Sequence, residues 1–113
     1  ALDVYGESTK PGTGLIIHDF HGNPNQQFEI RENNIICVHS NLVLDVSGEL
    51  KPGSSVIQAE PNGSDSQKFF LKGDGTIQTI NGLCLESSTP RTANRGQVVI
   101  QEPNGVTRKN LGA

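Results

Sequence analysis

Short apolar stretches recur along the chain at intervals of about 41 residues. The first stretch of each interval carries an acid, at Asp3, Asp45 and Glu86, and these acids lie 42 and 41 residues apart (45 − 3 and 86 − 45). No segment keeps apolar residues at i, i+3, i+4 and i+7, the spacing of an amphipathic helix. Short apolar runs separated by Gly, Pro, Asn and Ser are typical of strands joined by turns, so the pattern predicts an all-β chain.

Each interval contains the same further landmarks. They are a second apolar run (15–17, 56–58 and 98–100), a turn glycine (22, 63 and 105) and a closing Gln-x-Phe motif (26–28 and 67–69) that becomes Lys-Asn-Leu at 109–111. Three such units are few for an open array, whereas a closed barrel has no exposed sheet edge. The pattern therefore predicts a β-trefoil of three pseudo-symmetric repeats of about 41 residues. We expect one domain over 1–113, with repeats at approximately 1–36, 37–77 and 78–113.

Equivalent apolar positions of the three units are expected to form stacked core layers around the axis. The predicted layers are Leu2, Leu44 and Leu85; Ile16, Ile57 and Val99; and Phe28, Phe69 and Leu111.

Composition, charge and missing motifs argue against several classes of function. Hydrophobic content is 33% and aromatic content 4%, so a small core must be held by many small contacts. The net charge is −3 without a Lys/Arg cluster, which argues against nucleic acid as a partner. No apolar run approaches the roughly 20 residues of a membrane span. Metal-ligand spacing, a phosphate loop and a Ser/His/Asp arrangement are all absent from the sequence, so we expect neither a metal, nor a cofactor, nor an enzyme activity.

Cys37 and Cys84 stand at different places in their repeats. Two buried thiols that act as small hydrophobes are favoured over a single long-range disulfide, and both alternatives stay open at this point.

The motifs resemble those of the ricin-type (R-type) β-trefoil lectin domain family. The resemblance rests on Leu2-Asp3-Val4, Leu44-Asp45-Val46 and Cys84-Leu85-Glu86, and on Gln-x-Phe where the family has Gln-x-Trp. It covers essentially the whole chain and implies a carbohydrate-binding module. The implied ligands are galactose, GalNAc or glycans containing them, and the resemblance favours a secreted or extracellular location.

The resemblance also implies one shallow sugar pocket per repeat. In the first repeat Asp3 would accept hydrogen bonds from sugar hydroxyls, Asn25 would bond a hydroxyl and Gln26 would support the acid. His18 takes the position of the ring that packs on the sugar, and His21 matches a histidine often found in the same pocket. The alternatives are that Asp3 caps the turn after it and that His21 is a turn residue.

The other repeats depart from this set. The second keeps Asp45 and Gln67 but has Ala59 and Ser66 at the ring and amide positions, which predicts a weaker second site at most. The third has Glu86, Gln101, Arg108 and Lys109 at the four positions, and is expected to be structural.

A rival interpretation is a trefoil that serves as a protein-interaction or inhibitor scaffold with vestigial sugar sites. Under the lectin interpretation the chain would be part of a larger protein or a homo-oligomer, since one weak site needs added avidity. One further motif stands apart: Asn62-Gly63-Ser64 is a turn that also fits the acceptor pattern for N-glycosylation.

Overall fold

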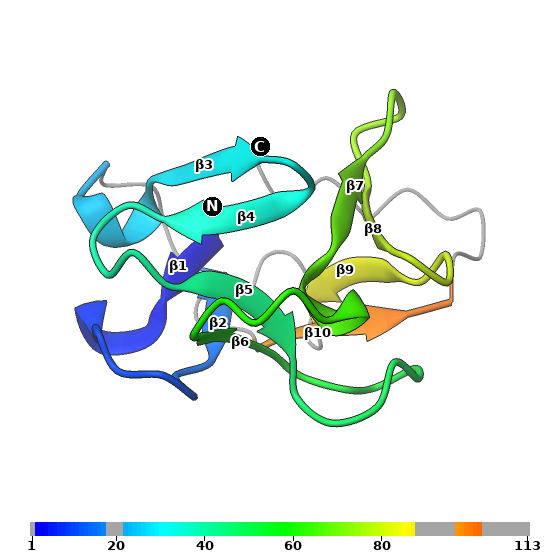
Figure 1. Cartoon of the computed structure of the whole chain (residues 1–113), viewed down its shortest axis with the longest axis horizontal. Coiled ribbons are helices and arrows are strands. Elements are labelled where there is room, and N and C mark those ends of the chain that lie inside the picture. Colours follow the sequence, from blue (N-terminus) through cyan, green and yellow to red (C-terminus); the bar gives the residue numbers. More distant parts are fainter. Residues whose placement is uncertain (1, 18–21, 88–96, 103–113) are drawn as a thin grey trace.

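The computed structural model describes residues 2–17, 22–87 and 97–102. Within these ranges the chain consists of short strands, three 3-10 turns and connecting loops, with no α-helix (Figure 1). The strands are β1 (Leu2–Val4), β2 (Leu15–Ile17), β3 (Phe28–Arg31), β4 (Asn34–Cys37), β5 (Val43–Val46), β6 (Val56–Ala59), β7 (Phe69–Leu71), β8 (Ile77–Thr79), β9 (Cys84–Ser87) and β10 (Val98–Gln101). The 3-10 turns are η1 (Tyr5–Glu7), η2 (Pro24–Gln26) and η3 (Asp65–Gln67).

The strands form three antiparallel sheets. Their orders are β1-β2, β3-β4-β5-β6 and β10-β9-β8-β7. In each repeat the acid-bearing strand pairs with the strand that follows it, as β1 with β2, β5 with β6 and β9 with β10. The register is equivalent in all three pairs, because Asp3 lies opposite Ile16, Asp45 opposite Ile57 and Glu86 opposite Val99.

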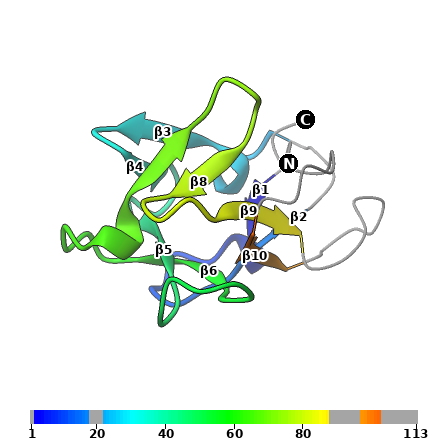
Figure 2. The same ribbon diagram turned by 90° about the vertical axis from the view of Figure 1, so that its right-hand side faces the viewer.

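Three isolated bridges join the repeats into a ring. Gly14 bridges to Ile57, Ser55 to Val99, and Gln97 back to Ile16, which are equivalent positions of successive repeats. These bridges bring β2, β6 and β10 together, and Figure 2 shows β10 beside β2. The predicted all-β fold with triangular symmetry is therefore confirmed.

The core confirms one predicted layer and shifts another by one residue. Leu2, Leu44 and Leu85 are buried together, as expected. The second layer consists of Leu15, Val56 and Val98, each fully buried, rather than the residue after each of them. The reason is strand alternation: Ile16, Ile57 and Val99 lie opposite the acids, and opposite residues of an antiparallel pair share one face.

The third predicted layer is described only in part. Phe69 is buried in the core, and Phe28 is half-buried and packs against the core cluster. Leu111 lies outside the described residues.

Cys37 and Cys84 are both buried and form no disulfide with each other. Burial raises the pKa of the Cys37 thiol to about 11, although a hydrogen bond with Ser40 acts in the opposite direction. The thiol is therefore a neutral, small core group, as the sequence favoured.

Two observations concern the described ranges alone. None of the helical segments there is long and apolar enough to cross a membrane. The same ranges hold no group of three or more His, Cys, Asp or Glu side chains placed to bind a metal ion.

Candidate functional site

The acid of the first repeat lies against the turn that carries Asn25 and Gln26. Strand β1 positions Asp3 against η2, although 22 residues separate Asp3 from Asn25. Asn25 donates from Nδ2 to Asp3 Oδ1 at 2.8 Å, and Gln26 donates from Nε2 to Asp3 Oδ2 at 2.7 Å. Each carboxylate oxygen therefore receives one side-chain amide hydrogen bond.

The turn itself is fixed by its own sequence. Pro24 stands at the first turn position, where its fixed φ suits the start of a helical turn and its missing N–H is not needed. The backbone N–H of Gln26 then donates to Asn23 O at 2.8 Å. Gly22, with φ of 76°, donates from its N–H to Gln26 Oε1 at 3.2 Å and accepts from Gln27 Nε2 at 2.9 Å. The turn thus presents two consecutive amide side chains to the acid.

The cluster is almost fully buried. Asp3 and Asn25 are each 3% exposed, and Gln26 is 8% exposed. Asn25 Nδ2 also donates to Val4 O at 3.3 Å, so both N–H donors of this side chain are used on β1. Its Oδ1 atom, in contrast, is buried and has no hydrogen-bond partner. The site therefore contains one acceptor atom that a donor could satisfy.

The two histidines predicted for this pocket, His18 and His21, lie outside the described residues. The structure consequently describes three of the five predicted residues, namely Asp3, Asn25 and Gln26, and brings all three together.

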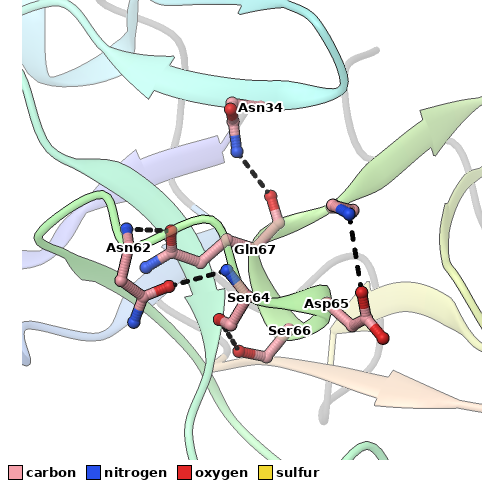
Figure 3. A network of polar contacts seen from close by, with 7 residues as sticks. Asn34, Asn62, Ser64, Asp65, Ser66 and Gln67 are labelled. Carbon is pink, nitrogen blue, oxygen red and sulfur yellow. Dashed lines mark hydrogen bonds and ion pairs between the residues drawn. The ribbon is translucent and has the colours of Figure 1, made fainter.

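The second repeat reproduces half of this arrangement. Gln67 lies on η3 and donates from Nε2 to Asp45 Oδ2 at 3.0 Å and to Glu60 O at 2.7 Å. Its Oε1 accepts from the backbone N–H of Asn62 at 2.8 Å, and its own carbonyl accepts from Asn34 Nδ2 at 2.9 Å (Figure 3). Gln67 is fully buried and its side-chain amide has a partner on both atoms.

The amide position accounts for the difference between the two repeats. Ser66 replaces the asparagine, and its hydroxyl lies 3.0 Å from Ser64 Oγ instead of reaching the acid (Figure 3). Asp45 Oδ1 is in consequence buried with no hydrogen-bond partner. Asp45 is 9% exposed, so this oxygen has lost water without gaining a protein donor.

Sequence reasoning missed three residues that shape these sites. Ile16 and Ile57 lie across the strand pair from the acids and provide an apolar neighbour on the same face. The strand pairing of an antiparallel hairpin would have been enough to find them. Asn34 supports Gln67 from a different repeat, and nothing in the local sequence indicates that contact.

The third repeat is described in part. Glu86 is buried on β9 and Gln101 is half-buried on β10. Arg108 and Lys109, expected to disrupt this copy, lie outside the described residues.

Comparison with known families identifies the class of domain. The family model described as "Ricin-type beta-trefoil lectin domain" matches residues 31–110, and the one described as "Ricin-type beta-trefoil lectin domain-like" matches residues 1–59. The chain belongs to the ricin-type β-trefoil lectin domain family. Among curated proteins, none matches the chain.

Solved structures agree on the fold. ThreeFoil, a designed 3-fold symmetric protein, has a TM-score of 0.82 and 27% identity, over 96% of this chain and 86% of that one. The C-half of the earthworm R-type lectin, crystallised with GalNAc, has a TM-score of 0.80 and 16% identity, over 96% and 84%. The exo-beta-1,3-galactanase 1,3Gal43A of Clostridium thermocellum has a TM-score of 0.78 and 27% identity over 95% of this chain but 26% of that one. In that enzyme the similarity therefore covers a small part of the protein.

Proposed function

We propose that the chain is a carbohydrate-binding domain with one dominant pocket in its first repeat. The observation that carries the proposal is that Asp3 is held on both oxygens by Asn25 and Gln26. Membership of a lectin-domain family supports sugar binding as the class of function. His18, as the ring that packs on the sugar, and His21 complete the proposed set.

The chemistry of the described residues suits a polyhydroxylated ligand. A carboxylate has about four lone-pair sites, so it can accept several hydrogen bonds, from amides and from hydroxyls alike. Hydroxyl bonds to an ionised acceptor are about twice as strong as neutral ones. The amide bonds to Asp3 also fix the acid in place before the ligand arrives, which lowers the entropy cost of binding. Because Asp3 is 3% exposed, we infer that the ligand displaces neighbouring groups as it enters.

Galactose-type sugars are the proposed ligand class. The earthworm lectin that shares this fold was crystallised with GalNAc, and the structure of a non-toxic bitter gourd homologue of type II RIPs, with a TM-score of 0.78, is a complex with alpha-methyl-D-galactoside. The second repeat, with Asp45 and Gln67, is proposed as a weaker site. We propose no enzyme activity for the domain and no cofactor.

Affinity for a single sugar should be low. A small pocket of this kind corresponds to a dissociation constant in the millimolar region, or about −4 kcal/mol. Useful binding to a glycan surface then needs several sites, and we propose that a longer parent chain or self-association provides them.

A titration followed by NMR tests the proposal. Addition of galactose or GalNAc should shift the amide signals of Asp3, Asn25 and Gln26 in a saturable way. Asn25→Ala should abolish these shifts, whereas Ser66→Ala, at the equivalent position of the second repeat, should retain them. The absence of shifts with both sugars, or identical shifts in Asn25→Ala, would contradict the proposal.

The scaffold interpretation remains the second candidate, and one observation favours it. The acid of the second repeat has a buried oxygen without a donor, which is the state expected of a site that has lost its ligand-binding set. A glycan array with no signal, together with capture of a defined protein partner, would support the scaffold over the lectin.

A further inference from the structure

The turn that leads into η3 contains an exposed Asn-Gly dipeptide. Asn62 and Gly63 are both exposed, and Gly63 has φ of 74° with open space where a Cβ would stand. Asn-Gly is the dipeptide in which the backbone nitrogen most readily reaches the preceding side-chain amide, because glycine adds no Cβ to obstruct the approach. Neither residue belongs to the proposed sugar pockets.

We propose that Asn62-Gly63 is a site of spontaneous deamidation through a cyclic succinimide. The backbone nitrogen of Gly63 loses its proton and attacks Asn62 Cγ, so that a new C–N bond forms, the Cγ–Nδ2 bond breaks and ammonia leaves. Water then opens the ring at either carbonyl and produces aspartate or isoaspartate. Water is the only other reactant.

The contacts around Asn62 favour this reaction. The Ser64 N–H donates to Asn62 Oδ1 at 2.9 Å, the oxygen on which negative charge develops as Cγ is attacked (Figure 3). A donor aimed at such an oxygen stabilises the tetrahedral intermediate. Within the described part of the chain, neither Asn62 Nδ2, the leaving group, nor the N–H of Gly63, the nucleophile, makes a hydrogen bond.

A second Asn-Gly dipeptide provides an internal control. Asn81 is exposed too, but it accepts from Thr79 Oγ1 at 2.5 Å and donates from Nδ2 to Leu50 O at 2.9 Å. The N–H of Gly82 donates to Thr79 O at 3.0 Å. Both the leaving group and the nucleophile of this dipeptide are therefore held in hydrogen bonds that must break before the ring can close.

The modification has a structural consequence for the second repeat. The backbone N–H of Asn62 supports Gln67 Oε1 at 2.8 Å, and Gln67 in turn holds Asp45. Isoaspartate lengthens the main chain by one carbon between this N–H and Ser64, and the Ser64 N–H loses its side-chain acceptor. The formal net charge falls from −3 to −4 (−3 − 1). Ageing of the chain should thus loosen the support of the Asp45 carboxylate.

Peptide mapping of the intact domain tests the proposal. The protein is made in a host without N-glycosylation, because a glycan on Asn62 Nδ2 would block the reaction, and is then incubated at mildly alkaline pH. Isoaspartate and aspartate should accumulate at position 62 at least about tenfold faster than at position 81, the factor that corresponds to the free energy of one hydrogen bond. Asn104-Gly105 lies outside the described residues and is resolved by the mapping as a separate peptide.

Two further measurements make the test decisive. In strong urea the two dipeptides should react at similar rates, since the contacts of Asn81 are lost. Asn62→Gln should remove the product at position 62 and leave position 81 unchanged. Equal rates at 62 and 81 in the folded protein, or an intact amide at 62 when 81 has reacted, would overturn the proposal.

Discussion

The hydrogen bonds of Asp45 show how one side-chain difference distinguishes two repeats with the same fold. In the first repeat Asn25 donates to the acid, whereas in the second Ser66 does not and Asp45 Oδ1 is left without a partner. A buried acceptor without a donor costs about 1–3 kcal/mol. The acid and the glutamine nevertheless persist in the second repeat, because Gln67 also supports Glu60 O and the turn at Asn62.

Ser66→Asn should therefore stabilise the protein. The longer amide side chain is expected to reach Asp45 Oδ1 as Asn25 reaches Asp3, and to raise the free energy of unfolding by about 1 kcal/mol. The measurement is urea unfolding at neutral pH, with Ser66→Ala as the control for loss of the contact with Ser64. A midpoint for Ser66→Asn at or below that of Ser66→Ala would contradict the expected bond.

Cys37 predicts a loss of stability at alkaline pH. The pKa of its thiol is raised from 9.0 to about 11 by burial, so the unfolded chain loses this proton at a lower pH than the folded one. The contribution is fully present below pH 9 and is lost as pH rises towards about 11, by roughly 2–3 kcal/mol. Unfolding in urea across this range should show a smaller decline for Cys37→Ala than for the parent protein. Parallel declines in the two proteins would exclude the thiol as the cause.

Strand pairing explains which strands and core positions could be predicted from the sequence. Repeat spacing identified all three acid-bearing strands and the layer of Leu2, Leu44 and Leu85. It did not show which residues of the second strand of each repeat face the core, because an apolar run such as Leu15 to Ile17 is hydrophobic on both faces. Strand pairing identifies the core-facing residue, since Ile16 lies opposite Asp3 and Leu15 therefore faces the core.

The tight turn between β3 and β4 could not be predicted from the sequence for a different reason. Glu32 and Asn33 have φ of 51° and 68°, so both adopt the left-handed conformation of a tight two-residue hairpin. The usual signal for such a turn is Asn-Gly or Asp-Gly, and Glu-Asn does not provide it. Pairing of Arg31 with Asn34 then fixes the register that brings Asn34 to Gln67.

Alanine substitutions at the observed and at the originally expected core position test which residues of the second strands form the core. Leu15→Ala removes a fully buried side chain and should lower the free energy of unfolding by about 2–5 kcal/mol. Ile57→Ala, at a half-buried position beside Asp45, should cost about half as much or less. The comparison is made by urea unfolding, and a larger loss for Ile57→Ala would restore the phase first expected from the sequence.

At the scale of the whole molecule, repetition predicted the trefoil but not how the repeats are joined. Equivalent hydrogen bonds link successive repeats, from Gly12 N to Gln58 O and from Gly53 N to Ile100 O, both at 2.7 Å. The sequence gives no sign of them because they are made by the backbone. The site was predictable where it follows the repeat, at Asp3, Asn25 and Gln26. The division into repeats at 36 and 77, and the ligand-binding roles of these residues, remain predictions.

One fully buried position breaks the symmetry, and it predicts that a more symmetric sequence is less stable. Position 58 is glutamine where the other repeats have Ile17 and Ile100. Gln58 donates from Nε2 to Ser8 O at 2.9 Å and to Lys10 O at 2.8 Å, and its Oε1 accepts from Ser40 Oγ at 2.9 Å. The side chain thereby connects the loop after β1 to the turn after β4.

Gln58→Ile would make all three repeats alike at this position but remove the three hydrogen bonds of the Gln58 side chain. We expect the free energy of unfolding to fall by about 1–3 kcal/mol, because the loss of these hydrogen bonds outweighs the gain in apolar contact. Ile100→Val, a conservative change at the equivalent buried position, is the control and should cost about 0.5–1.5 kcal/mol. If Gln58→Ile unfolded at a higher urea concentration than the parent, the cross-repeat contacts would be of little energetic value, and the fold would rest on the symmetric core alone.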